Sequence, residues 1–469
     1  MFRTSLMFIL TSLASIGGFL FFQWQDYVTA LKHEDEEQVM VDQTIEVTYR
    51  DDKLYIKQTL YDLPEGTYTV TLPTGISEAS CINSEGQACE RWKEGEERTS
   101  FTSSGNVTIT YHLRVQRNTE PLIKNWYAQF SNLKILHTIV QLSDESKQEG
   151  TWVVSGKRTS FIEKKYINFY RFETAGTPSS LYWHESPMVM NEWTSTITVY
   201  TPTEFTIKAE EWKKFLEQVE ATIIMSDIQS STDGKLYFFR NEQDFEQLQY
   251  ELAFNYVNNR FDFLEEEKWL ASVVSSLLAD EKSNHSKANL IVQELKDQLT
   301  EKTYFALIDS IIAHDGELSA ERLDNMIYEL TGLKTNFFQE NKQENVPFRH
   351  FLLFDGRKLQ VNGRVLDKEE AVYFSGRRWY PFLSTMQALG YETRPIVERE
   401  SYIVKQAGNV YRLYLDETFF IFNEESFGLT RNPLTELNEE IFIDEAWLEK
   451  IFRVYISHLD ETILIEKNF

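Results

Sequence analysis

The stretch LYFFRNEQDFEQLQYELAFNYV, residues 236–257, contains a strand and a helix in immediate succession. Four apolar and aromatic residues at 236–239 follow the turn Asp233-Gly234 and predict a buried strand. Beyond it, apolar residues recur every three or four positions, which predicts a helix near 245–258. This order indicates that one strand interrupts a series of helices.

The segments on either side of this strand have the same helical period. AEEWKKFLEQVEATI, at 209–223, places Trp212, Phe215, Leu216 and Val219 at helical spacing. Later segments with this spacing lie near 245–258, 268–280, 286–299 and 303–314. We therefore expect residues 201–342 to form a mainly helical domain.

Residues 43–200 have the pattern of short strands. β-branched and aromatic residues alternate or run together, and turns such as DLPEG and PTG separate the segments. The pattern predicts an antiparallel β region, arranged as two layers or as two domains.

Residues 351–469 contain a faint internal repeat. The segment GRRWYPFLSTMQALGY, from Gly376, is echoed by EEIFIDEAWLEKIFRVY, from Glu439. In both, an apolar strand leads into an amphipathic helix and then into another strand. Two βαβ-like half-units are predicted, so we expect the whole chain to be a multidomain α+β protein.

The composition is that of a folded chain with an acidic surface. Apolar residues make up 42% of the chain and aromatic residues 14%, which excludes disorder as its main state. The 73 Asp and Glu residues outnumber the 47 Lys and Arg residues, and the formal net charge of -26 would repel nucleic acid. A well-solvated surface and the attraction of cations both agree with this charge.

The first residues predict a membrane anchor. The apolar run LMFILTSLASIGGFLFF, at 6–22, follows Arg3 and precedes the acidic segment HEDEEQ at 33–38. A transmembrane helix over 4–22 would be close to the minimum length, and the positive-inside rule then leaves the rest of the chain outside the cytoplasm. A signal peptide cleaved near Val28-Thr29-Ala30 is the alternative. We expect a single-pass protein of a bacterial-type cell membrane with a C-terminal ectodomain.

Two cysteines, Cys81 and Cys89, flank the turn-like segment INSEGQA. Outside the cytoplasm such a pair can form a local disulfide across a hairpin, and two unpaired thiols are the alternative. The eight histidines are scattered along the chain, so the sequence predicts no metal site and no cofactor.

The C-terminal segment resembles a known family. VNG at 361–363, followed by GRRWYPFLSTMQALGY, is similar to the stalk domain often called copper amine oxidase N-terminal-like. The matching positions are Gly376, Arg377, Pro381, Ala388, Leu389 and Gly390. The resemblance implies an envelope module for adhesion or spacing over 351–469, and it implies neither copper nor amine oxidation. In the second copy, Asp444 stands at the Pro position.

The middle of the chain resembles gluzincin metallopeptidases of the aminopeptidase-N type. YELAF, at 250–254, falls where the His-Glu-x-x-His helix of that family belongs. WLASVVSSLLADE, from Trp269, is similar to the helix that holds the third zinc ligand. YELTGLKTNFFQEN, from Tyr328, is similar to a signature near the end of the catalytic domain. The three segments occur in the order of the family.

The resemblance implies a site without zinc. Tyr250, Phe254 and Ser272 stand where the family has two His and one Glu, and only Glu251, at the general-base position, matches. Zinc catalysis needs three ligands and a base, and a phenyl ring cannot coordinate the metal. We therefore expect a peptidase-like fold without its metal, which would be a pseudoenzyme.

Together these features predict a membrane-anchored, non-enzymatic envelope protein that serves recognition or scaffolding. Its ligand would be cell-wall material, a protein or a peptide held around Glu251. An active envelope hydrolase with an unidentified site and a purely structural surface spacer are the alternatives.

Overall fold

The computed structural model describes residues 39–93, 96–117, 119–146, 149–203, 214–227, 232–241, 244–397, 400–415 and 417–467. The chain forms two compact units. The first consists of residues 1–207 and 220–241, and the second of residues 208–219 and 242–469.

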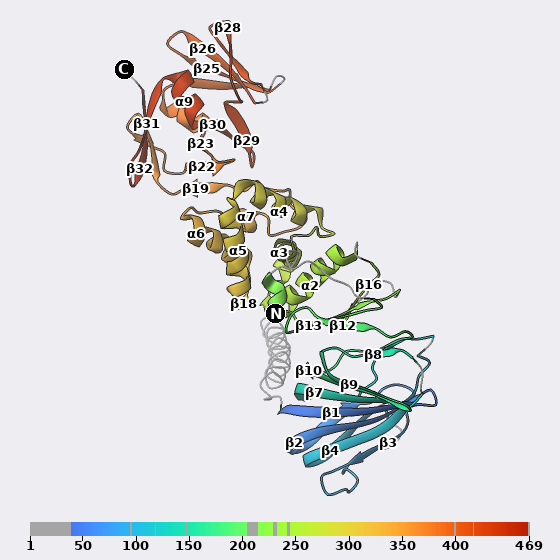
Figure 1. Cartoon of the computed structure of the whole chain (residues 1–469). Coiled ribbons are helices and arrows are strands. Elements are labelled where there is room, and N and C mark those ends of the chain that lie inside the picture. The colour runs from blue at the N-terminus through green and yellow to red at the C-terminus, as the bar shows by residue number, and fades with distance from the viewer. Residues whose placement is uncertain are drawn as a thin grey trace, which may run out of the picture. The chain divides into compact units, whose positions relative to one another are not determined.

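The first unit is built on an eight-stranded sheet, blue to teal in Figure 1. Its strands follow the order β3-β4-β2-β1-β7-β10-β9, and β6 pairs with β2. The strands are β1 (Val39–Arg50), β2 (Lys53–Thr71), β3 (Ser77–Ile82), β4 (Arg98–Arg114), β6 (Gln129–Phe130), β7 (Leu133–Asp144), β9 (Lys157–Lys164) and β10 (Ile167–Ala175). Alternating residues of β1, among them Ile45, Val47 and Tyr49, are buried, as expected for a strand with one face on the core.

The sequence predicted an antiparallel sheet, but the observed sheet contains both parallel and antiparallel strand pairs. β1 is antiparallel to β2 but parallel to β7. Side chains alternate between the two faces of a sheet whether neighbouring strands are parallel or antiparallel. The alternation of polar and apolar residues along one strand therefore does not show whether its neighbour runs parallel or antiparallel to it.

A buried ion pair lies in the core of the first unit. Arg117 Nη1 donates to Asp144 Oδ2 at 2.6 Å, and the two side chains are 1% and 3% exposed. Trp152 Nε1 donates to the same oxygen at 2.8 Å. The guanidinium carbon lies 4.0 Å from the ring centroid of Tyr49 and 3.8 Å from that of Trp183. Each charge is tolerable here because the other neutralises it.

Two smaller sheets complete the first unit, with the orders β5-β11-β8 and β12-β13-β14-β16-β15. Their strands are β5 (Leu122–Ile123), β8 (Thr151–Val153), β11 (Leu181–His184), β12 (Val189–Glu192), β13 (Ile197–Thr201), β14 (Ala221–Met225), β15 (Thr232–Asp233) and β16 (Leu236–Phe239). β13, β14 and β16 are parallel to one another.

These parallel strands contradict the prediction that residues 201–342 form a mainly helical domain. Residues 221–225, expected to lie in a helix, form β14, and Phe215 and Leu216 lie in a 3-10 turn, η2 (Lys214–Gln218). A strand buried on both faces lacks the alternation of polar and apolar residues, and sequence cannot distinguish it from a buried helical segment.

The second unit begins with helices, green to yellow in Figure 1. They are α2 (Asp244–Arg260), α3 (Leu270–Ala279), α4 (Ser286–Gln298), α5 (Glu301–Ala313), α6 (Ala320–Thr331) and α7 (Phe337–Glu340), with the 3-10 turn η3 (Glu265–Glu267) and the paired short strands β17 (Phe261–Asp262) and β18 (Gly316–Glu317). α3 packs against both α2 and α4. The Thr300 and Ser319 side chains accept backbone hydrogen bonds at the starts of α5 and α6, as N-caps do.

The C-terminal part of this unit consists of sheets and two short helices, orange to red in Figure 1. The sheet orders are β19-β22-β23-β30-β29, β21-β20-β32-β31 and β24-β25-β26-β27-β28. The elements are β19 (Leu353–Asp355), β20 (Lys358–Val361), β21 (Arg364–Val365), β22 (Ala371–Phe374), β23 (Arg377–Pro381), α8 (Phe382–Ala388), β24 (Glu392–Ile396), β25 (Ser401–Gln406), β26 (Asn409–Tyr414), β27 (Phe419–Phe422), β28 (Glu425–Gly428), β29 (Leu434–Leu437), β30 (Glu440–Asp444), α9 (Glu445–Phe452), β31 (Val454–His458) and β32 (Thr462–Lys467).

The two predicted half-units share a strand-to-helix order but are not βαβ units. β23 leads into α8 and β30 into α9, and these two strands are antiparallel neighbours in one sheet. The strands after the helices, β24 and β31, belong to two other sheets. Pro381 precedes α8, whereas Asp444 at the equivalent position accepts a hydrogen bond from Trp447 N at 3.2 Å and caps α9. Gly390, just after α8, has a φ of 81°, which suits glycine at a helix end.

The predicted transmembrane helix, residues 4–22, lies outside the described residues. In the part of the chain that the structure does describe, no helix is long and apolar enough to cross a membrane. The single-pass localisation predicted from the sequence finds no support in the described residues, and the membrane anchor is not carried further.

Cys81 and Cys89 are joined in a disulfide, with Cα atoms 5.3 Å apart. Between them the chain makes a turn in which Gly86 N donates to Asn83 O, and Cys89 N donates to Cys81 O at 3.0 Å. The bond closes a short loop at the end of β3.

We expect native protein to contain no thiol that reacts with a maleimide before reduction. Replacing both Cys81 and Cys89 by Ser should lower the free energy of unfolding by about 2–3 kcal/mol, since the closed loop no longer restricts the unfolded chain. Denaturant unfolding of both proteins measures the difference. Two labelled thiols in unreduced protein would contradict the bond.

The buried ion pair gives a second expectation. Asp144→Asn leaves the Arg117 cation buried without a carboxylate and should lower the free energy of unfolding by about 3–5 kcal/mol. Glu46→Gln is the matched control, because it breaks the exposed pair Lys57–Glu46 and should cost less than about 1 kcal/mol. Similar losses of unfolding free energy in the two variants would show that the buried Arg117–Asp144 pair stabilises the fold no more than an exposed pair does.

Candidate functional site

Helix α2 carries three of the residues singled out in the sequence. Leu248, Leu252 and Val257 are buried, and they hold the helix on the rest of the unit. Tyr250 and Phe254 are one turn apart, with ring centroids 6.1 Å apart and an angle of 23° between the ring planes. The two rings therefore stack on one face of α2.

Glu251 lies next to Tyr250 and is half-buried. Gln247 Nε2 donates to Glu251 Oε1 at 3.4 Å. Burial raises the pKa of the Glu251 carboxyl, and the hydrogen bond from Gln247 opposes this shift.

Ser272 lies on α3 and is 4% exposed. Every residue of α3 is buried. α2 and α3 are in contact, but Ser272 and Phe254 do not line the pocket described next, whereas Tyr250 and Glu251 do. The structure thus brings two of the four predicted site residues to one cavity.

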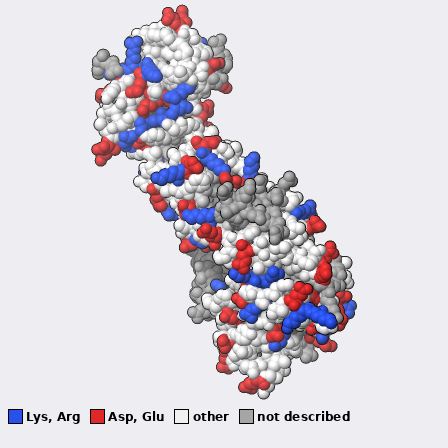
Figure 2. All heavy atoms as spheres, in the orientation of Figure 1, with Lys and Arg blue, Asp and Glu red and all other residues white. Residues whose placement is uncertain are grey.

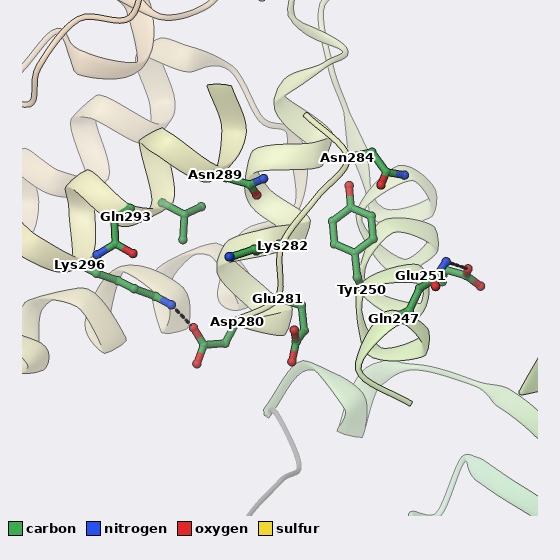
Figure 3. A pocket seen from close by; sticks show the side chains of 11 residues that line it. Gln247, Tyr250, Glu251, Asp280, Glu281, Lys282, Asn284, Asn289, Gln293 and Lys296 are labelled. Atoms are coloured by element: carbon green, nitrogen blue, oxygen red, sulfur yellow. Dashed lines mark hydrogen bonds and ion pairs between the residues drawn. The ribbon is translucent and has the colours of Figure 1, made fainter. Parts of the chain in front are cut away.

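A pocket of about 700 Å³ lies between α2, α4 and the loop that joins α3 to α4, and we call it the polar pocket (Figure 3). Its lining is polar except for one aliphatic side chain. The lining residues are Gln247, Tyr250, Glu251, Asp280, Glu281, Lys282, Asn284, Asn289, Val292, Gln293 and Lys296.

The polar pocket is lined by more acidic than basic side chains. Three carboxylates, from Glu251, Asp280 and Glu281, accompany two ammonium groups, from Lys282 and Lys296. Lys296 forms an ion pair with Asp280, which in Figure 3 lies on the side of the pocket opposite Glu251. The pocket therefore carries an excess of negative charge and is suited to a cationic group.

Sequence reasoning missed the residues that the α3–α4 loop and α4 contribute. Asp280 ends α3 in the left-handed conformation, with a φ of 61°, and turns the chain back toward α2. The run Asp280-Glu281-Lys282 directly after an apolar helix was a usable signal, because three charged residues at a helix end must face solvent or a cavity.

The zinc of the gluzincin family does not fit the residues at the matching positions. Tyr250 offers a phenol, Phe254 only carbon atoms and Ser272 a buried hydroxyl, which leaves Glu251 as the one strong zinc ligand of the four. Among the described residues, no three His, Cys, Asp or Glu side chains are placed to hold a metal ion together. No reaction step through zinc follows from these residues.

No family model matches the sequence, and no curated protein matches it. Solved structures similar to the chain include the M1 zinc metallopeptidase from Deinococcus radiodurans, with a TM-score of 0.38 and 12% identity over 65% of this chain and 92% of that chain. A mutant two-domain M1 zinc metallopeptidase bound to L-tryptophan has a TM-score of 0.40 and 11% identity over 63% of this chain and 92% of that chain.

The likeness concerns the fold alone at this level of identity. The similar structures are those of enzymes, and the prediction that this chain is not an enzyme is not carried forward. The chain is similar in fold to M1 zinc metallopeptidases, and its own residues at the matching site are not those of a zinc centre.

Proposed function

We propose that this chain recognises short peptides that carry a positive charge, and that they bind in the polar pocket. The observation that carries the proposal is the wall of that pocket, in which carboxylates and carboxamides surround about 700 Å³. Ligand sites with a few well-placed polar groups typically have volumes of roughly 300–1,000 Å³.

Each kind of group in the wall has a counterpart on a peptide. A carboxamide both donates and accepts hydrogen bonds, so it can pair with backbone N–H and C=O groups. Gln247, Asn284 and Gln293 line the pocket with such groups, whereas the carboxamide of Asn289 is already bonded to the backbone of Ser283. The carboxylates of Glu251 and Glu281 suit an amine or a guanidinium, and the ring of Tyr250 offers a face to the same cation.

The charge of the whole chain favours the same class of ligand. A net charge of -26 raises the local concentration of cations and increases their rate of association. Figure 2 shows acidic and basic side chains interspersed over the visible face, so the attraction comes from the overall excess of acid. The polar pocket then determines where on the chain the cationic peptide binds.

Glu251 has the central role in this proposal. It lies at the position where the resemblance implies a general base, and here it would pair with the cationic group of the peptide. This role agrees with its half-buried position, since charged hydrogen bonds are stronger where water is partly excluded.

Calorimetric titration of the full chain with the N-acetylated amide of Arg-Gly-Gly-Ala, whose only positive charge is the Arg side chain, tests the proposal. We expect this peptide to bind and the N-acetylated amide of Glu-Gly-Gly-Ala not to bind. Glu251→Gln should weaken binding about tenfold or more, because a hydrogen bond to a charged group contributes roughly 1.5–3 kcal/mol.

Glu329→Gln is the matched control, because it removes an exposed carboxylate on α6 outside the pocket with the same change in net charge. Equal losses in the two variants, or equal binding of the Arg and Glu peptides, would contradict the proposal.

The proposal also predicts a pH dependence. Binding of a cation needs the Glu251 carboxylate, and burial raises the pKa of this group above that of an exposed Glu. The affinity for the N-acetylated amide of Arg-Gly-Gly-Ala should therefore fall as the pH is lowered, starting at a higher pH than an exposed carboxylate would allow. Glu251→Gln should flatten this part of the profile, and an unchanged profile in the variant would assign the titration to another group.

A further inference from the structure

We infer that a second pocket, directly beside the first, binds a large apolar side chain of the same peptide, an inference that rests on the proposed function. This pocket, which we call the apolar pocket, has a volume of about 650 Å³. It is lined by Lys214, Phe215, Leu277, Leu278, Asp280, Lys296, Glu301, Tyr304, Phe305, Ile308, Asp309 and Ile312.

The two pockets share the ion pair Asp280–Lys296, and both side chains line each of them. The pair is partly open to solvent, with exposed fractions of 44% for Asp280 and 36% for Lys296. A ligand that reaches from one pocket to the other must pass this pair, which presents both N–H donors and carboxylate oxygens. A peptide backbone has the complementary groups at every residue.

The apolar pocket differs in chemistry from its neighbour. Leu277 and Leu278 from α3 and Phe215 from η2 are buried at its base, with at most 2% of each exposed. Phe305, on α5, is 56% exposed although it lines the pocket. An aromatic ring left open beside a recessed apolar wall is suited to cover an apolar group that enters there.

Together, the two pockets define a ligand with two anchors. A cationic group enters the polar pocket at Glu251, the backbone crosses the Asp280–Lys296 pair, and a bulky apolar or aromatic side chain enters beside Phe305. The preferred substrate class is thus a peptide in which a basic residue and a large apolar residue are separated by a short spacer.

Peptide amides in which Arg and Phe are separated by one, two or three Gly residues test this inference by calorimetry on the full chain, each beside its counterpart with Ala in place of Phe. At the best spacing we expect the Phe peptide to bind about tenfold more tightly than the Ala peptide, from burial of the ring. In Phe305→Ala the ratio between the two affinities should fall toward one.

Leu290→Ala is the matched control, because Leu290 is an exposed apolar residue of α4, 52% exposed, that lines neither pocket. It should leave the tenfold ratio intact. If the Arg–Ala peptides bind but Phe adds nothing at any spacing, or if Phe305→Ala keeps the ratio, the apolar pocket is not a subsite and the proposed function stands. If no Arg peptide binds, the proposed function itself fails, and the inference fails with it.

Discussion

The complete burial of α3 constrains the whole helical part of the second unit. All ten residues of this helix are buried, including three serines, so its neighbours must surround it. The buried hydroxyls are tolerable where they find acceptors, as when Ser275 Oγ donates to Ala271 O at 2.6 Å within the helix. A helix covered on all sides can border a cavity only near its ends. Both pockets accordingly lie at its C-terminal end, where Asp280 turns the chain out of the core.

This constraint explains why only some of the four residues singled out by the resemblance line the polar pocket. Ser272 is buried within α3, whereas Tyr250 and Glu251 on α2 line the polar pocket. Glu251 is accessible and is suited to bind a cation, and Ser272 is part of the packing.

The ion pairs Arg117–Asp144 and Asp280–Lys296 differ in burial, and this difference gives them different roles. Arg117–Asp144 is 1% and 3% exposed and has aromatic rings around it, so its contribution is structural and its disruption leaves a buried charge. Asp280–Lys296 is more than one-third exposed on both sides, where an ion pair contributes little to folding stability. A pair of the second kind can exchange partners with a ligand at low cost, which suits its position between two pockets.

Local sequence was sufficient for α2, α3, α4 and α5 and for most strands of the first sheet, because helical period and alternation act over a few neighbouring residues. Tyr250 and Glu251 were singled out by the resemblance to gluzincin metallopeptidases and not by helical period. Local sequence could not give the parallel pairing of β1 with β7, or of β13, β14 and β16, because the partners are far apart in the chain and a doubly buried strand has no alternation. The polar pocket required the same long-range information. Asp280 and Lys296 line one pocket with α2 residues only in the folded unit, where α3 is buried and the chain turns at Asp280, and that packing is a property of the unit rather than of any segment within it.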